Sequence, residues 1–237
     1  MVNGERRVSH IINQRILNMV TYESIKNDKA IRAYIKAADE SLAALGYTEH
    51  SFFHVTKVAE TAAKILTALG FDERTVELAK IAAHLHDIGN LVNRVDHSQS
   101  GAVMAFRILH NLGMEAEEIA TVVTAIGNHD EGVGVPVNAV SAALILADKS
   151  DVRRTRVRNA DFASFDIHDR VNYSVEESAL EINSEEKTIN LVLKIDTSIS
   201  PIFDYFEIFV ERMLLCRRSA DKLGLKFGLF INGQKFI

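Results

Sequence analysis

The sequence predicts a mainly α-helical protein with a small α+β element at its C-terminal end. Apolar residues recur every three or four positions over most of residues 5–150, which is typical of amphipathic helices. In two later segments, 179–197 and 225–237, apolar and polar residues alternate instead, which is typical of strands. We therefore expect a helical domain over residues 1–165 and a small α+β subdomain over residues 166–237.

Helix ends are marked in the sequence by glycines and by capping residues. Asp72 is placed to begin one helix as its N-cap, and Pro136 is placed in the first turn of another. The helices predicted in the helical domain cover 5–20, 28–45, 51–69, 73–89, 97–112, 115–129 and 137–150. In the subdomain we expect helix over 168–180 and 200–223. Residues 179–197 alternate around a polar break at 183–186 and are interpreted as two strands, the second at 187–196. A further strand is expected at 225–231, followed by a turn at Asn232-Gly233.

Composition excludes several classes of protein. With 237 residues, 47% hydrophobic residues, 25% charged residues and 2 prolines, the chain is neither disordered nor of low complexity. The single cysteine, Cys216, excludes an internal disulfide and a thiolate zinc site. We find no export signal and no apolar stretch of membrane-spanning length, so we expect a soluble, cytoplasmic protein. The net charge of −5 argues against a general nucleic-acid-binding protein.

Histidines and aspartates gather at the ends of the predicted helices. A helical bundle can bring such residues from distant segments into one cleft, where imidazole and carboxylate together suit first-row transition metals. His86 and Asp87 also follow the apolar stretch LAKIAAHL, where an uncompensated buried pair is costly and a bound metal would satisfy both side chains. The residues at these ends are His54, His86, Asp87, His97, His129, Asp130 and Asp148.

The order of these residues resembles that of the HD-domain metal-dependent phosphohydrolases. Those enzymes use a lone His, an adjacent His-Asp pair and a later Asp as ligands. The corresponding positions here are His54, then His86 and Asp87 in AAHLHDIGN, then Asp148 in ALILADKSD. The resemblance runs from about residue 50 to residue 158 and implies an HD-type helical bundle.

Two further segments resemble the two-metal members of this superfamily, including the HD-GYP branch. They are DHSQSGAVMAFRIL around His97 and GNHDEGVGVP around His129. The chain departs from that pattern in three places: Asp130 replaces a second histidine, Gly134-Val135-Pro136 replaces Gly-Tyr-Pro, and Asn90 replaces a lysine. These departures favour a more general phosphohydrolase over one that acts on cyclic-di-GMP.

The resemblance implies a ligand set and a reaction. The implied ligands are His54, His86, Asp87 and Asp148 for one ion, and His97, His129 and a bridging Asp87 for a second ion. One or two divalent ions (Fe, Mn, Mg, Zn or Ni) are implied, with Asp87 and His86 as the catalytic residues. A metal-bound hydroxide would then attack a phosphate ester or anhydride, with a nucleotide as the expected substrate.

Basic residues near the implied ligands are candidates for binding the phosphate. Arg153 is the preferred contact because a guanidinium group can bind phosphate oxygens in a bidentate way, and Lys149 and Lys57 are the next candidates. His50 is a candidate proton donor to the leaving oxygen. The His168-Asp169 pair is interpreted as the start of a helix.

Two other functions are consistent with the sequence. The first is a non-catalytic nucleotide-binding or regulatory module that acts through a homodimer, with the strands at 187–196 and 225–231 pairing across the dimer edge. The second is nucleic-acid binding through the arginines of 153–158, which the net charge disfavours. No membrane partner is expected.

Overall fold

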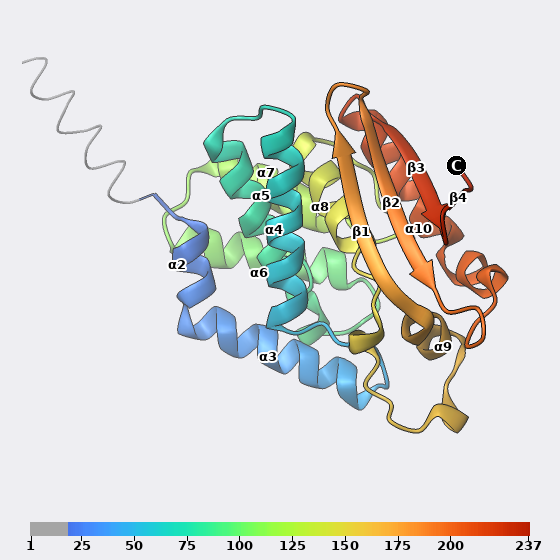
Figure 1. Ribbon diagram of the computed structural model, residues 1–237. Helices are drawn as coiled ribbons and strands as arrows, with labels where there is room; N and C mark the ends of the chain where they lie inside the picture. Colours follow the sequence, from blue (N-terminus) through green and yellow to red (C-terminus); the bar gives the residue numbers. More distant parts are fainter. Residues whose placement is uncertain (1–18) are drawn as a thin grey trace, which may run out of the picture.

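A computed structural model describes residues 19–237 and shows a bundle of helices with a sheet along one side (Figure 1). The mainly α-helical class with a small C-terminal α+β element is confirmed. Most of the helix predicted over 5–20 lies outside the described residues. Within residues 19–237, no helix has the length and apolar character needed to cross a membrane.

Several helices of the bundle begin at a residue whose side chain caps the first turn. Ser51 accepts a hydrogen bond from the backbone N–H of Phe53, and Asp72 accepts one from Thr75. Six predicted helices are present, and a short unpredicted helix precedes them behind a capping box at Thr21. The helices are α2 (Tyr22–Asn27), α3 (Lys29–Ala44), α4 (Phe52–Ala68), α5 (Glu73–Leu85), α6 (His97–Asn111), α7 (Ala116–Gly127) and α8 (Ala139–Lys149).

The helix predicted over 73–89 is shorter than expected. α5 ends at Leu85, and a 3-10 turn, η1 (Ile88–Leu91), follows it. η1 packs so closely on α6 that a Cβ atom at Gly89 would collide with the carbonyl oxygen of His97 and lie 2.5 Å from the backbone nitrogen of Gly101. Only glycine permits this approach, which brings the chain around Asp87 close to the start of α6.

The C-terminal part is a four-stranded sheet with a helix on one face. Its elements are α9 (Ile167–Ser174), β1 (Val175–Asn183), β2 (Thr188–Ile195), α10 (Ile202–Lys222), β3 (Lys226–Ile231) and β4 (Gln234–Lys235). The strand order is β1-β2-β3-β4; β2 and β3 are parallel and joined by α10, and the other pairs are antiparallel. The predicted turn at Asn232-Gly233 connects β3 and β4.

The helix predicted over 168–180 is wrong in its second half. α9 stops at Ser174, and the next residues form β1, which pairs with β2 from Val175 opposite Ile195 to Asn183 opposite Thr188. The alternation from Ala179 onward predicted the end of this strand, but local spacing does not reveal its first residues, because the partner that stabilises them follows later in the chain.

A single hydrophobic cluster joins the two parts. It includes Leu144 of α8, Leu191 of β2 and Tyr205 of α10, all with at most 1% of their surface exposed. α10 packs against both α8 and β3, and therefore lies between the bundle and the sheet. The predicted domain boundary at residues 165–166 stays a prediction. This packing brings α9 and α10 to the end of α8 that carries Asp148.

Candidate metal centre

Four buried histidines direct their Nε2 atoms toward one another. His54 donates from Nδ1 to Asp151 Oδ2 at 2.8 Å. His86, His97 and His129 each donate from Nδ1 to the carbonyl oxygen three residues earlier, at 2.7, 3.1 and 2.6 Å. Because these oxygens only accept hydrogen bonds, each neutral ring keeps its proton on Nδ1 and presents Nε2 as a lone pair. This is the orientation that metal-binding histidines require.

The carboxylate of Asp87 lies between two pairs of these rings. Its Oδ2 atom is 3.6 Å from His54 Nε2 and 3.2 Å from His86 Nε2. Its Oδ1 atom is 3.5 Å from His97 Nε2 and 4.0 Å from His129 Nε2. Asp87 therefore has the geometry of a ligand that bridges two adjacent sites.

Asp148 completes the first of these sites. Its Oδ1 atom lies 3.3 Å from His54 Nε2 and 3.6 Å from His86 Nε2. Ligand atoms at about 2.1 Å from a metal ion are about 3.0–3.4 Å apart in octahedral or tetrahedral geometry, which is close to these separations. Among residues 19–237, two groups bring ligand atoms within 4.8 Å of one another: His54, His86 and Asp148, and His86, Asp87 and His129.

Several polar atoms of this cluster are buried without a hydrogen-bond partner among residues 19–237. They are His54 Nε2, His86 Nε2 and Asp87 Oδ2. His97 Nε2 and His129 Nε2 are only 3.2 Å apart, although each of these atoms carries a lone pair and no proton when its ring is neutral. Such an arrangement is costly without a cation and is satisfied by one. The residues therefore fit one or two divalent metal ions, with nitrogen and oxygen as ligand atoms.

The charges of the cluster agree with this interpretation. Burial alone raises the pKa values of Asp87 and Asp148, but the nearby His86 and Lys149, respectively, hold them well below their usual range. Burial lowers the pKa of His129 to about 3, so its ring is neutral. Burial also disfavours the charged form of His86, yet the carboxylates of Asp87 and Asp148 raise its pKa to about 10. The two carboxylates thus require a positive charge beside them, which a proton on His86 or a metal ion can supply.

Asp151 supports the cluster from the Nδ1 side of His54. This carboxylate is only 1% exposed and also binds Lys57 at 2.8 Å and Arg153 at 3.0 Å. Arg153 pairs with Glu49 as well, and its guanidinium lies over the ring of Phe53. Lys57 and Arg153, the predicted phosphate contacts, therefore hold Asp151 behind His54.

A cavity of about 580 Å³ opens onto the metal cluster. Asp87, His97, His129 and Asp148 line it on the bundle side, together with Lys149. Lys149 is 4% exposed and pairs with Asp148 at 2.7 Å and with Glu131 at 3.2 Å. Arg153 and Lys57 are not among the described residues that line this cavity.

Residues 51–158 match the model of the HD domain family. This segment is an HD domain. The chain is also 28% identical over 224 residues to an uncharacterized protein of Methanocaldococcus jannaschii, with 84% of this chain and 85% of that protein covered. A crystal structure of a predicted HD superfamily hydrolase from an uncultured Thermotogales bacterium shares 26% identity, with a TM-score of 0.40, and covers 52% of this chain and 68% of its own.

The HD domain holds every residue that the sequence predicts as a ligand, and the structure brings them together. The grouping differs in one detail from the prediction, because the second group of close ligand atoms contains His86 beside Asp87 and His129. His97 lies next to this group through its contacts with Asp87 and His129. Asp130, which stands where two-metal HD domains have a histidine, is 4.0 Å from His97 Nε2 through Oδ1.

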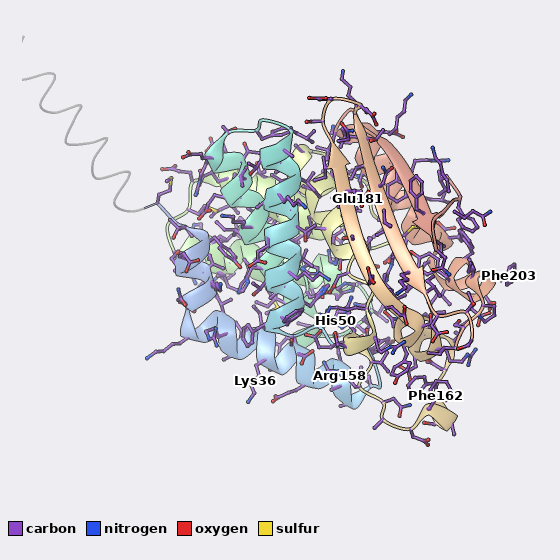
Figure 2. The ribbon with its side chains drawn as sticks, in the orientation of Figure 1. Lys36, His50, Arg158, Phe162, Glu181 and Phe203 are labelled. Atoms are coloured by element: carbon purple, nitrogen blue, oxygen red, sulfur yellow. The ribbon has the colours of Figure 1, made fainter. Side chains whose placement is uncertain are left out.

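Two other histidines singled out in the sequence also line the cavity. His50 is held by a hydrogen bond between Nδ1 and Thr48 O at 2.7 Å, just before α4 (Figure 2). Burial keeps its pKa well below the usual value, so the ring is neutral and does not carry the proton of a ready acid. His168 and Asp169 lie in the first turn of α9 behind the N-cap Asp166, which agrees with a helix start, yet both line the cavity.

Sequence reasoning missed two arginines in the cavity. Arg94 of the HD domain places Nη1 3.3 Å from His97 Nε2 and stacks on Tyr47, with 5.7 Å between the guanidinium and the ring centroid. Its position three residues before His97 could have indicated it. Arg212 of α10 reaches the same cavity from outside the HD domain, and no motif in the sequence marks it.

Proposed function

We propose that this protein is a metal-dependent phosphohydrolase that cleaves a phosphate ester or anhydride of a small molecule. The observation that supports this most directly is the cluster of unpartnered Nε2 and carboxylate atoms at the wall of a cavity. A divalent ion bound there would supply Lewis acidity, which activates water and polarises a phosphoryl oxygen. HD domains are typical of hydrolases, which agrees with the match over residues 51–158.

The protein's own residues would bind and orient the phosphate. Arg94 has no carboxylate partner among the described ion pairs, and it lies beside His97 at the cluster. Its stacking on Tyr47 holds the guanidinium in place, so its free N–H groups can bind phosphate oxygens. Lys149 contributes a second positive charge next to Asp148. Arg94 and Lys149 would thus place positive charge on two sides of the bound phosphate group.

We propose a nucleotide as the substrate class. A volume of about 580 Å³ lies within the range of roughly 300–1,000 Å³ for small-molecule sites, which suits a mononucleotide. The rings of Tyr47 and His168 can stack on a base, and the carboxylates of Asp166 and Asp169 can accept hydrogen bonds from sugar hydroxyls or a base amino group.

Metal reconstitution followed by a substrate panel tests this proposal. The purified protein is stripped of metal, loaded with Mn²⁺, Fe²⁺, Zn²⁺, Mg²⁺ or Ni²⁺, and assayed for phosphate release from nucleoside mono-, di- and triphosphates. We expect turnover with at least one ion and loss of turnover on chelation. Asp87→Ala should lose both metal and activity, because Asp87 faces both ligand groups. Full activity of that variant, or turnover that chelators do not affect, would refute the proposal.

The regulatory alternative predicts a different outcome of the same panel. A nucleotide would raise the melting temperature of the metal-loaded protein but would not be hydrolysed with any of the five ions. The homodimer expected for that alternative stays a prediction, and sedimentation of the full chain measures it.

A further inference from the structure

The C-terminal helix α10 contributes to the cavity although it lies outside the HD domain. Phe209 and Arg212, one turn apart on α10, line the same cavity as Asp87 and Asp148. α10 packs on α8, the helix that carries Asp148, so its position relative to the metal cluster is fixed by the shared core. The wall of the cavity that faces the cluster is therefore built partly by a segment that the HD domain does not include.

The side chain of Arg212 is held in one orientation by two contacts. Its Nε atom donates to Glu131 Oε1 at 2.8 Å, and its guanidinium carbon lies 4.1 Å from the centroid of the Phe209 ring. Within the described part of the chain, neither terminal amino group of Arg212 donates a hydrogen bond that competes with a ligand. The side chain is 21% exposed, so these groups remain reachable from the cavity.

Glu131 joins this arginine to the metal cluster. Its Oε1 atom binds Arg212, its Oε2 atom binds Lys149 at 3.2 Å, and Lys149 binds Asp148 Oδ2 at 2.7 Å. The carboxylates of Glu131 and Asp148 balance the charges of Lys149 and Arg212. Lys149 pairs with both carboxylates, whereas Arg212 pairs with one oxygen atom through Nε and leaves its two terminal amino groups unpaired among the described residues. Arg212 therefore keeps N–H groups that are free to bind an anion in the cavity, as Arg94 does.

We propose that Arg212 forms a phosphate subsite from α10, so that the C-terminal part completes the substrate-binding site of the HD domain. This inference rests on the proposed function, since it assigns the side chain that binds an oxyanion of the substrate next to the metal cluster. The ligand class is a phosphate group bound in a bidentate way by the two terminal amino groups. Phe209 and Glu131 act as positioning residues that keep the fork aimed into the cavity.

Binding of inorganic phosphate to the Mn²⁺-loaded full chain tests this subsite. Titration calorimetry compares the wild-type protein with Arg212→Ala, Arg212→Lys and the control Arg217→Ala, an exposed arginine on the same helix that does not line the cavity. Losing a charge-assisted bidentate contact should weaken phosphate binding roughly 10- to 100-fold in Arg212→Ala. Arg212→Lys keeps the ion pair with Glu131 but lacks the two terminal amino groups of the guanidinium. Its phosphate affinity should therefore lie between those of the wild type and Arg212→Ala. Arg217→Ala should match the wild type.

Metal content and melting temperature, measured on the same samples, separate binding from folding. Manganese content should stay unchanged in both Arg212 variants, because Arg212 contacts none of the cluster's ligand atoms directly. If Arg212→Ala does not fold, Arg212→Lys decides, since it preserves the partner of Glu131. Phosphate affinity within twofold of wild type in the folded variants overturns the subsite, and so does a metal-loaded wild type that binds no phosphate. If the substrate panel shows no turnover but the phosphate results hold, the proposed hydrolysis fails and the subsite stands.

Discussion

Replacing Asp151 by Asn should weaken metal binding although none of the expected metal ligands is substituted. Asp151 accepts from His54 Nδ1 at 2.8 Å and binds Lys57 and Arg153 through Oδ1. An Asn side chain has one acceptor oxygen and one amino group, so it cannot serve His54 and both cations together. Either the amide nitrogen faces the cations, or it faces His54 and favours the tautomer whose Nε2–H points into the cluster.

The size of the effect follows from these contacts. Removing an outer partner of a metal-binding histidine costs about 10–100-fold in metal affinity, and we expect the same range here. Stability should also fall, because the cations lose a buried counter-charge. The loss should be about 2–4 kcal/mol, below the upper range for buried pairs, since the Lys57 side chain is 36% exposed and partly solvated.

Competition with a calibrated chelator measures the metal affinity, and urea unfolding of the metal-free protein measures the stability. Glu40→Gln is the matched control, because Glu40 forms an exposed pair with Lys36 on the outer side of α3 (Figure 2). It should change neither quantity. A folded Asp151→Asn variant with metal affinity within twofold of wild type would show that Asp151 does not orient His54 for binding.

Three other variants or treatments test separate parts of the structure. Gly89→Ala should separate η1 from α6 and lower both the melting temperature and the metal content. In the control Gly127→Ala, the added Cβ would lie 3.6 Å from its nearest neighbour, so the melting temperature should change little. Equal effects of the two substitutions would contradict the close approach at Gly89. His129→Ala should reduce metal content by one ion per chain in a two-ion protein and leave the ion near His54 bound; undiminished metal content would contradict its role as a ligand. Cys216 is 1% exposed and burial raises the pKa of its thiol to about 12, so Ellman's reagent at pH 8 should label it only after unfolding, and rapid labelling of the folded protein would contradict that burial.

The sequence predicted the bundle and the ligands well because both depend on local signals. Apolar spacing and N-caps such as Asp72 are properties of consecutive residues, and they located six helices. The ligands lie at or near helix ends, so short motifs such as His86-Asp87 carried the information about the cluster.

The parts that the sequence did not predict depend on contacts between distant residues. The first residues of β1, 175–178, belong to a strand because β2 pairs with this segment, and nothing in their own spacing distinguishes them from a continuing helix. The role of Arg153 depends on Glu49, which lies 104 residues earlier, and Arg212 depends on Glu131, 81 residues earlier. A basic residue near a ligand in the sequence is therefore a weak guide to phosphate contacts, because side-chain pairing decides which cations remain free.

Anomalous X-ray scattering at the metal edges locates the ions that the clustered histidines and aspartates are expected to bind. Crystals of the full chain, grown after loading with Mn²⁺ or Zn²⁺, are measured on both sides of the absorption edge. We expect an anomalous peak enclosed by His54, His86, Asp87 and Asp148, and a second one beside Asp87 and His129 if two ions bind. Metal-loaded crystals with no anomalous peak within this cluster would contradict the assignment of these residues as ligands.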